Sequence, residues 1–396
     1  MCIKKINVIL VVTIAALSAC GGSGSGSSTQ NNSSTTTIIS SSSSSLSSST
    51  SSVVTNNITQ CELLNFKSDE TISYRLPILF GQCPSTDTSI TIEVAGEIFT
   101  WPVLDGFFKG AVLLDPGSND ITLTASGKTS LVKIIVAASQ NVKKVQMVYA
   151  IATDDDGHFL AAEDESNDIE TAKKHLAVEA LMLQSAMAQM MYKAVGKHKT
   201  FTLVEDENGV PEIQVFQVSQ TRETLYAMDG LTIYYSIQDQ LKTETQNNLK
   251  YMVTMGFSGY ENGQTLAHTA LGGSNLALFG GLHLHTCPKT LEDISASFSN
   301  EKTIDTRILP DDSAGRGTYW ANCATGMGAS LHELGHSFEL PHSEYGIMSR
   351  GFDRFNRLFM ISEPAFPSAI TPQIEYDAVW HPESLTILAY SVWITQ

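Results

Sequence analysis

The segment HELGHSFELPH, residues 332–342, constrains the fold of this chain more than any other part of the sequence. His332 and His336 are four residues apart, so on an α-helix their side chains lie on one face, one turn apart. Both imidazoles can then bind the same metal ion, and Glu333 can reach a water bound to that metal. The spacing therefore predicts a helix that carries a metal site.

This helix has to end soon after His336. Pro341 disfavours a helical conformation for Leu340. The resulting break allows His342, six residues after His336, to turn back as a third ligand. Three neutral imidazoles with an open fourth position are typical of a catalytic zinc site. The competing interpretation is a buried helix whose histidines are satisfied by hydrogen bonds alone.

The motif resembles that of the metzincin clan of zinc endopeptidases, HExxHxxGxxH followed by a Met-turn. The positions that match are His332, Glu333, His336 and His342. Met348, in YGIMSRG, stands six residues after the last histidine and matches the Met-turn. Glu339 departs from the pattern, because the clan has a glycine there that permits unusual backbone angles. We expect the turn to be made differently here, with help from Pro341, and the zinc ligands to be kept.

A longer stretch is similar to a zinc metallopeptidase family known from fungi and bacteria. It runs from ALFGG through TYWANCATGMGASLHELGHSFELPH to GIMSRGFDRFNR, and the helix IETAKKHLAVEALMLQSAMAQMM is also similar. The resemblance implies a Zn²⁺ cofactor and a protein or peptide substrate, glycoproteins included. It also implies that Glu333 acts as general base while a zinc-bound water attacks the scissile carbonyl. Some metzincins stabilise the oxyanion with a tyrosine where this chain has Arg350; Tyr345 and His381 are alternative donors or structural residues.

The first sixty residues predict an export signal followed by a flexible tether. Two lysines precede an apolar run of twelve residues, which is too short to span a bilayer but suits a signal peptide at 1–19. The run ends in LSAC, which resembles a bacterial lipoprotein signal with Cys20 as the lipidated residue; an ordinary cleaved signal is the alternative. Residues 21–60 contain 17 Ser, 7 Thr and no charged residue, so we expect 20–60 to be a disordered tether. This predicts an exported protein, lipid-anchored at the bacterial cell envelope.

Four cysteines remain once Cys2 and Cys20 are set aside. An even number in an exported chain indicates two disulfides, and proximity favours the pairs Cys61–Cys83 and Cys287–Cys323. Four free or metal-binding thiols are the alternative, although no CxxC spacing supports a metal site.

Two folded parts are expected after the tether. Residues 61–140 alternate with period two, as in Ile90, Ile92 and Val94, and predict a β-sandwich that resembles immunoglobulin-like modules. Residues 141–396 mix strands and helices and predict an α+β, metzincin-like zinc peptidase domain. Its elements are a buried strand at VKKVQMVYAIA, a helix over 167–195 capped by Asn167 with Glu170 and stopped by Gly196, and strands at TFTLVED, EIQVFQV, LTIYYSI and YMVTMGF.

Two further clusters have a structural and a functional interpretation. The run Asp154, Asp155, Asp156 lacks the spacing of an EF-hand loop, which favours a solvated turn over a cation site. His283 and His285 are two residues apart and would share one face of a strand. An edge-strand pair near the cleft is favoured over a second metal site. In the metzincin clan an edge strand runs beside the bound peptide; the region preceding these histidines could be that strand, and a substrate would then add antiparallel to it.

The charge balance limits the classes of partner. With 24 basic and 41 acidic residues the net charge is −17, which argues against nucleic acid as a ligand. Contact with a membrane is expected through the N-terminal lipid alone, and the protein is expected to be a monomer. Two other functions fit the same sequence: a surface binding or adhesin lipoprotein with a peptidase-like scaffold, and a zinc amidase that acts on cell wall.

Overall fold

The structure is a computed structural model that describes residues 58–364, 366, 368–371 and 377–396. All of these belong to one compact unit. The predicted signal peptide at 1–19, the lipidated Cys20 and nearly all of the 20–60 tether lie outside the described residues. Within the described part, no helix is both long and apolar enough to cross a membrane.

Residues 62–136 form two β-sheets. The three-stranded sheet has the order β1 (Glu62–Leu63), β3 (Ile78–Gln82), β6 (Phe107–Ala111). The five-stranded sheet has the order β2 (Glu70–Ile72), β8 (Lys128–Val136), β7 (Gly117–Ala125), β4 (Ser89–Val94), β5 (Glu97–Pro102). All neighbours pair antiparallel except β2 with β8.

The two sheets share one apolar core because their strands alternate as the sequence predicted. Ile90 and Ile92 of β4 are fully buried and pack in the same cluster as Leu79 of β3 and Phe108 of β6. The Cys61–Cys83 disulfide, which was predicted, joins this core. A likeness of this sandwich to immunoglobulin-like modules stays a prediction, as does the boundary at residue 140.

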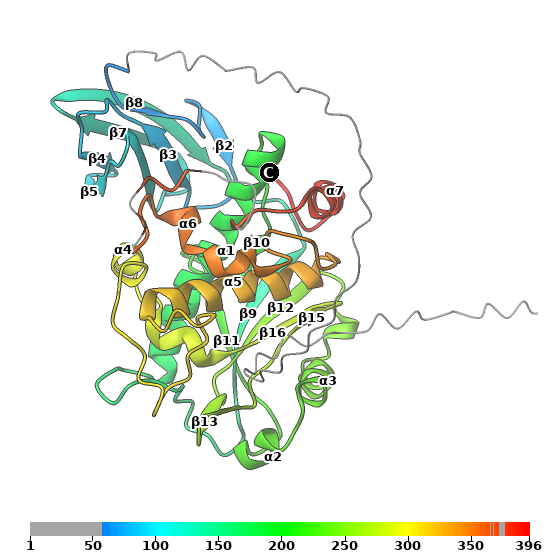
Figure 1. Ribbon diagram of the computed structural model, residues 1–396. Helices are drawn as coiled ribbons and strands as arrows, with labels where there is room; N and C mark the ends of the chain where they lie inside the picture. The colour runs from blue at the N-terminus through cyan, green and yellow to red at the C-terminus, as the bar shows by residue number, and fades with distance from the viewer. Residues whose placement is uncertain (1–57, 365, 367, 372–376) are drawn as a thin grey trace, which may run out of the picture. The chain divides into compact units, whose positions relative to one another are not determined.

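Another, mostly parallel sheet forms the centre of residues 144–280 (Figure 1). Its strands are β9 (Lys144–Ile151), β10 (Thr202–Leu203), β11 (Ile213–Gln217), β12 (Leu249–Met255), β15 (Ala270–Gly273) and β16 (Leu276–Gly280). Four strand pairs are parallel, and only the edge strand β15 runs antiparallel, against β16. A short hairpin, β13 (Gly259–Glu261) with β14 (Gln264–Leu266), precedes β15.

Helices cover both faces of this sheet. On one face α1 (Ile169–Val195) and α5 (Tyr319–Ser337) pack on side chains such as Met252 and Phe279, and on the other α3 (Gly230–Leu241) packs on Val253 and Leu278. The smaller helices are α2 (Arg222–Tyr226), α4 (Asp293–Ser297), α6 (Asn356–Phe359), α7 (Pro382–Tyr390) and the 3₁₀ turns η1 (Thr243–Thr245), η2 (Gly281–Thr286) and η3 (Arg350–Arg354). The predicted mixture of helices and strands is confirmed, and the predicted strands at 142–152, 212–218 and 251–257 are present.

Three local predictions were wrong. The cap of α1 is Asp168, whose carboxylate accepts from Thr171 N, while the Asn167 amide bonds to Phe159 O instead. LTIYYSI is not a strand but part of α3, because its buried residues Ile233 and Ile237 recur at helical spacing after an Asp229 cap. The segment with His283 and His285 is not a strand but the 3₁₀ turn η2.

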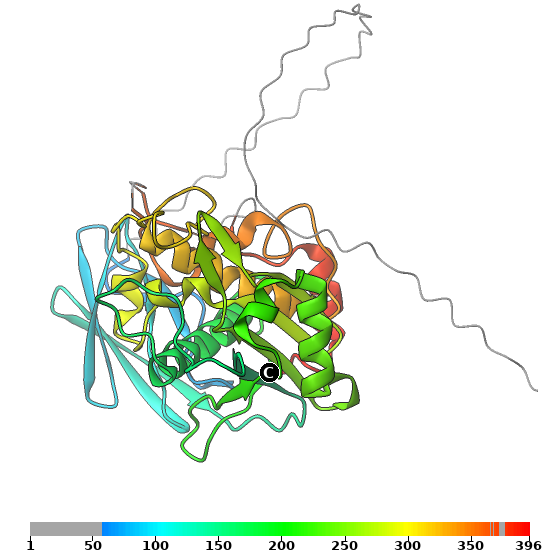
Figure 2. The same cartoon turned by 90° about the horizontal axis from the view of Figure 1, so that it is seen from below.

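The N-terminal sheets pack directly against α1 (Figures 1 and 2). Asn65 donates to the Gln189 side chain at 2.8 Å, and Ser185 of α1 donates to Leu76 O. Lys109 of β6 is 4% exposed and donates to Arg357 O at 2.6 Å, in the segment after the site; burial holds the pKa of Lys109 well below its usual range. The two sheets are therefore joined to the rest of the chain by buried polar contacts.

Candidate metal centre

The three motif histidines meet at one point, as predicted. The Nε2 atom of His336 lies 3.1 Å from Nε2 of His332 and 3.1 Å from Nε2 of His342. His332 and His336 lie on α5, and His342 comes from the segment that follows it. His332 is buried and His342 is exposed, so the cluster opens to solvent on the side of His342.

The hydrogen bonds of the outer ring nitrogens determine the tautomers of His332 and His336. His332 Nδ1 donates to Ile347 O at 2.7 Å and His336 Nδ1 donates to Leu340 O at 2.8 Å, because a carbonyl oxygen can only accept. Each proton is thus on Nδ1, and the Nε2 atoms carry lone pairs. Lone pairs at 3.1 Å repel each other, and a cation between them removes the conflict. Burial also lowers the pKa of His332 to about 3, which favours the neutral form that binds metal. The donor set fits Zn²⁺.

The turn after α5 brings His342 back in a way that differs from our expectation. Glu339 adopts the left-handed conformation, with φ at 71°, and Leu340 N donates to Gly335 O. This is a Schellman end, in which the left-handed position usually holds glycine. The chain therefore makes the same kind of turn that glycine would allow, with glutamate bearing the backbone cost. Pro341 comes after the helix has already ended at Ser337.

Glu333 lies on α5 next to the first histidine and is 6% exposed. Among the described residues, its carboxylate has no hydrogen-bond or ion-pair partner. Burial raises the pKa of Glu333 to about 8. Burying a carboxylate without a partner is unfavourable in free energy, and a nearby cation would offset this penalty.

Met348 lies in the turn that follows His342 and packs against α5. It is 1% exposed, and the turn that holds it is closed by Ser343 N donating to Met348 O at 2.9 Å. A Cβ placed on Gly335 would lie 2.6 Å from Met348 Sδ, so glycine lets the sulfur approach α5 closely. The Met-turn and the clan assignment implied by the resemblance stay predictions.

The edge strand β15 runs beside the same part of α5. A Cβ on Gly272 of β15 would lie 2.1 Å from Glu333 O and 2.8 Å from His336 Cβ. The outer side of β15 has no partner strand among the described residues. One edge strand of the sheet is therefore β15, which lies in the region preceding His283 and His285, where an edge strand was expected.

Other candidate residues have structural partners. His283 is fully buried, with Nε2 3.2 Å from Glu179 Oε2, and within the described chain neither it nor His285 joins a three-ligand group. The turn Asp154–Asp156 holds Arg222 through Asp155. The Tyr345 and His381 rings pack edge to face at 4.8 Å.

A second ionisable cluster lies at the start of α5, where sequence reasoning saw none. Glu165 accepts from Tyr319 at 3.0 Å and Lys302 at 3.1 Å, and lies 3.3 Å from His285 Nδ1. Burial alone would raise the pKa of Glu165, but these partners outweigh it and lower the pKa to about 2. The partners are 120 and more residues away in sequence, so no local signal could have found them. The predicted Cys287–Cys323 disulfide is present nearby and joins η2 to α5.

The sequence of the chain is similar to those of a known protein family and of two fungal proteins. Residues 60–394 match the sequence model of a family described as "Putative peptidase family". The chain is 27% identical over 348 residues to a "putative zinc metalloproteinase" of Saccharomyces cerevisiae, with 76% of this chain and 49% of that protein covered. A second such protein, from Schizosaccharomyces pombe, is 27% identical over 336 residues, with 77% and 55% covered. The chain spans about half the length of these relatives.

Solved structures resemble it more distantly. OgpA from Akkermansia muciniphila, solved as a catalytically inactive form with an O-glycopeptide substrate, gives a TM-score of 0.42 at 12% identity, with 66% of this chain and 63% of that one covered. Archaemetzincin from Methanopyrus kandleri gives 0.28 at 10% identity, with 63% and 96% covered. On the strength of the match across residues 60–394, the chain belongs to this peptidase family.

Proposed function

We propose that this protein is a zinc-dependent endopeptidase of the metzincin type, with Glu333 as its general base. The observation that carries the proposal is the meeting of three histidine Nε2 atoms, with the buried, unpartnered carboxylate of Glu333 next in sequence to the first histidine. His332, His336 and His342 would hold the metal. Zn²⁺ bound there supplies a Lewis acid, which polarises the scissile carbonyl and acidifies water.

The residues of the chain supply the remaining steps. Glu333 accepts a proton from the attacking water and returns it to the leaving amine. The bonds from Nδ1 to Ile347 O and Leu340 O hold the imidazoles of His332 and His336 in one orientation and one tautomer. Met348 is buried against Gly335 of the same helix and would exclude water from that side of α5.

Strand β15 offers a place for the substrate. An extended peptide could pair antiparallel with its free edge, which would lay the peptide beside Glu333 and His336. Recognition through backbone hydrogen bonds tolerates many side chains and suits cleavage within a chain. We further propose that Cys20 carries a lipid and that residues 20–60 tether an exported enzyme to the bacterial envelope.

Two measurements test the proposal together. Glu333→Gln should bind zinc as the wild type does but lose cleavage by a factor of about 10² to 10⁴. Glu97→Gln, at an exposed position of β5 in the N-terminal sheets, makes the same chemical change away from the site and should keep full activity. If Glu333→Gln cleaves peptides normally, the assignment is wrong.

The other two functions predict different results. A binding protein with a peptidase-like scaffold would hold no zinc or would bind its target without cleaving it. A cell-wall amidase would release fragments from peptidoglycan and leave protein substrates intact. Mass spectrometry of a peptide mixture, with and without chelator, separates these outcomes and shows where the enzyme cuts.

A further inference from the structure

An exposed arginine lies one aromatic ring away from the histidine cluster. Arg350 begins η3, two residues after Met348, and its side chain is 58% exposed. Its guanidinium stacks on Phe352, with Cζ 4.7 Å from the ring centroid. The Phe352 ring in turn meets the His332 ring edge to face, at 5.3 Å between centroids. Arg350 therefore sits at the surface immediately beside the metal centre.

Asp353 holds this arginine in place by one edge. Arg350 Nε donates to Asp353 Oδ2 at 3.0 Å and Nη2 donates to Asp353 Oδ1 at 3.1 Å. The fork of a guanidinium has a second edge, formed by Nη1 and the outer hydrogen of Nη2. No described residue bonds to that edge through Nη1. It has the geometry that accepts a carboxylate with two parallel hydrogen bonds.

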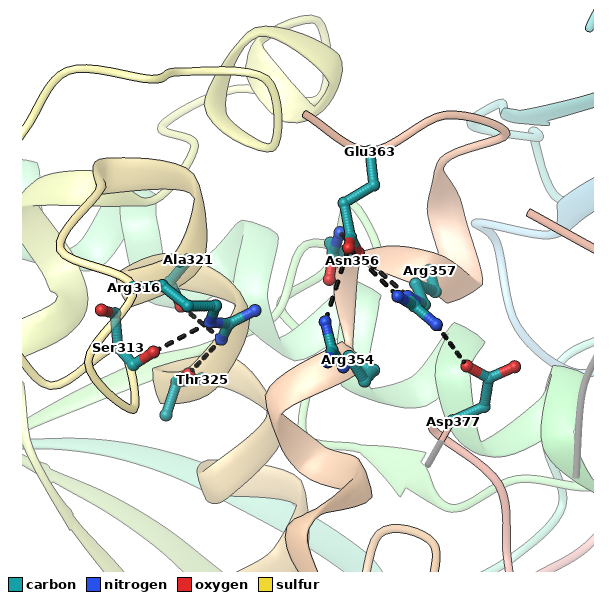
Figure 3. A network of polar contacts seen from close by, with 9 residues as sticks. All are labelled: Ser313, Arg316, Ala321, Thr325, Arg354, Asn356, Arg357, Glu363 and Asp377. Carbon is teal, nitrogen blue, oxygen red and sulfur yellow. Dashed lines mark hydrogen bonds and ion pairs between the residues drawn. The ribbon is translucent and has the colours of Figure 1, made fainter. Parts of the chain in front are cut away.

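A second arginine lies behind the first and adds to the positive charge. Arg316 Nη2 donates to Thr325 Oγ1 at 2.7 Å, and Thr325 Oγ1 donates to Asp353 Oδ1 at 3.2 Å. Arg316 and Arg350 thus share a single carboxylate through Thr325, which leaves a surplus of one positive charge. Figure 3 shows Arg316, from the loop before α5, beside Thr325 of α5.

The neighbouring arginines do not contribute to this surplus. Arg354 and Arg357 both pair with Glu363, and Arg357 also pairs with Asp377, as Figure 3 shows. The whole chain carries a net charge of −17. Excess positive charge beside the histidine cluster of an acidic protein attracts anions to this part of the surface.

We propose that Arg350 binds a carboxylate group of the substrate close to the bond that is cleaved. The inference rests on the proposed peptidase function and names a specificity residue for it. Asp353 and Phe352 hold the guanidinium in one orientation, so little conformational freedom is lost when the carboxylate arrives. The carboxylate has two sources in a peptide: an Asp or Glu side chain within the chain, or the free C-terminus.

The test uses zinc-loaded full-length protein and peptides cleaved in the mixture described above. Each peptide is made in matched pairs, with Glu or Gln at positions around the cleaved bond, and with a free or amidated C-terminus. For one of the two kinds of pair, the acid should have a kcat/KM about 10- to 100-fold above its amide, as expected for a charge-assisted bond. The kind of pair identifies the source of the carboxylate.

Arg350→Gln should abolish that preference by lowering kcat/KM for the acid and leaving its amide partner unchanged. Arg350→Lys should keep part of the preference, because the charge remains but the fork is lost. Arg307→Gln is the matched control: Arg307 is 86% exposed, pairs with Asp305 and makes the same charge change elsewhere. It should keep the full preference.

Two results would overturn the proposal. One is equal kcat/KM for acid and amide in every wild-type pair; the other is an equal loss for both in Arg350→Gln, which would make Arg350 a structural partner of Asp353. If no peptide is cleaved, the proposed function fails by itself. Calorimetric titration of the zinc-loaded wild type and of Arg350→Gln, with a model peptide that has Glu and a free C-terminus and with its amidated Gln counterpart, then still decides whether Arg350 selects a carboxylate.

Discussion

Helix α5 can hold the metal centre because glycine lets the segment after Met348 approach its backbone, and this gives a quantitative prediction. A Cβ on Gly328 would lie 2.0 Å from Phe352 O, 2.8 Å from Phe352 C and 3.1 Å from Phe352 Cα. These are backbone atoms, so they cannot turn away as a side chain can. Gly328→Ala therefore forces α5 and η3 apart.

The expected loss follows from two opposing effects. Alanine within a helix is favoured over glycine by about 1 kcal/mol, whereas overpacking a tight interior costs about 1–3 kcal/mol and more when backbone must move. We expect Gly328→Ala to lower the free energy of unfolding by about 1–2 kcal/mol. Equilibrium unfolding in urea, followed by circular dichroism, measures this change.

Gly335→Ala provides the control in the same helix. Its Cβ would meet Met348 Sδ at 2.6 Å, and a thioether can change rotamer to make room. The propensity gain should nearly balance the repacking, so we expect a change within about 1 kcal/mol of zero. If Gly328→Ala instead stabilised the protein by about 1 kcal/mol, the close approach of Phe352 to α5 would be refuted.

Three further predictions follow from the site and its surroundings. Chelation should lower the melting temperature and added Zn²⁺ should restore it, with no response in a His342→Ala variant; a response there would show that the zinc binds elsewhere. The pKa of Glu165 is depressed in the folded state, so its contribution, about 1–2 kcal/mol after solvent screening, is present above pH about 4.5 and is lost as pH falls toward about 2. Acid titration of stability should therefore be shallower in Glu165→Gln over this range, and an unchanged slope would contradict the assignment. Glu339→Gly should raise the free energy of unfolding by up to about 1 kcal/mol relative to Glu339→Ala, since both lose the carboxylate but glycine alone adopts φ of 71° without strain; equal stabilities would mean that the turn carries no backbone cost.

The meeting of the three histidines was predictable because the information for it lies within one short stretch of sequence. The positions of His332, His336 and His342 depend on helical geometry and on one turn, so spacing alone brings them together. The left-handed backbone conformation of Glu339 could not be predicted from the sequence. The return of His342 imposes the turn and overrides the conformational preference of glutamate.

Other elements depended on distant partners and were misread for that reason. LTIYYSI has the β-branched and aromatic content of a strand, yet it is a helix, because Ile233 and Ile237 bury one helical face against the sheet. His283 was placed on a strand, but the nearby helices fix it: Glu179 of α1 pairs with it and Gly326 of α5 makes room for its ring. Neither partner is visible within the local window around His283.

The packing of the N-terminal sheets on α1 limits how recombination could exchange parts of this protein during evolution. Leu76 and Ile78 belong to the apolar core around α1 and α5, while Ala188 of α1 belongs to the core of the two sheets. Each core thus contains residues from the other side of residue 140. Recombination at that point would leave two incomplete interiors and expose the buried ends of both, so the sheets are not an appendage that evolution could exchange freely. The family match from residue 60 to 394 spans the same region, as expected if the sheets and the metal-binding part have descended as one piece.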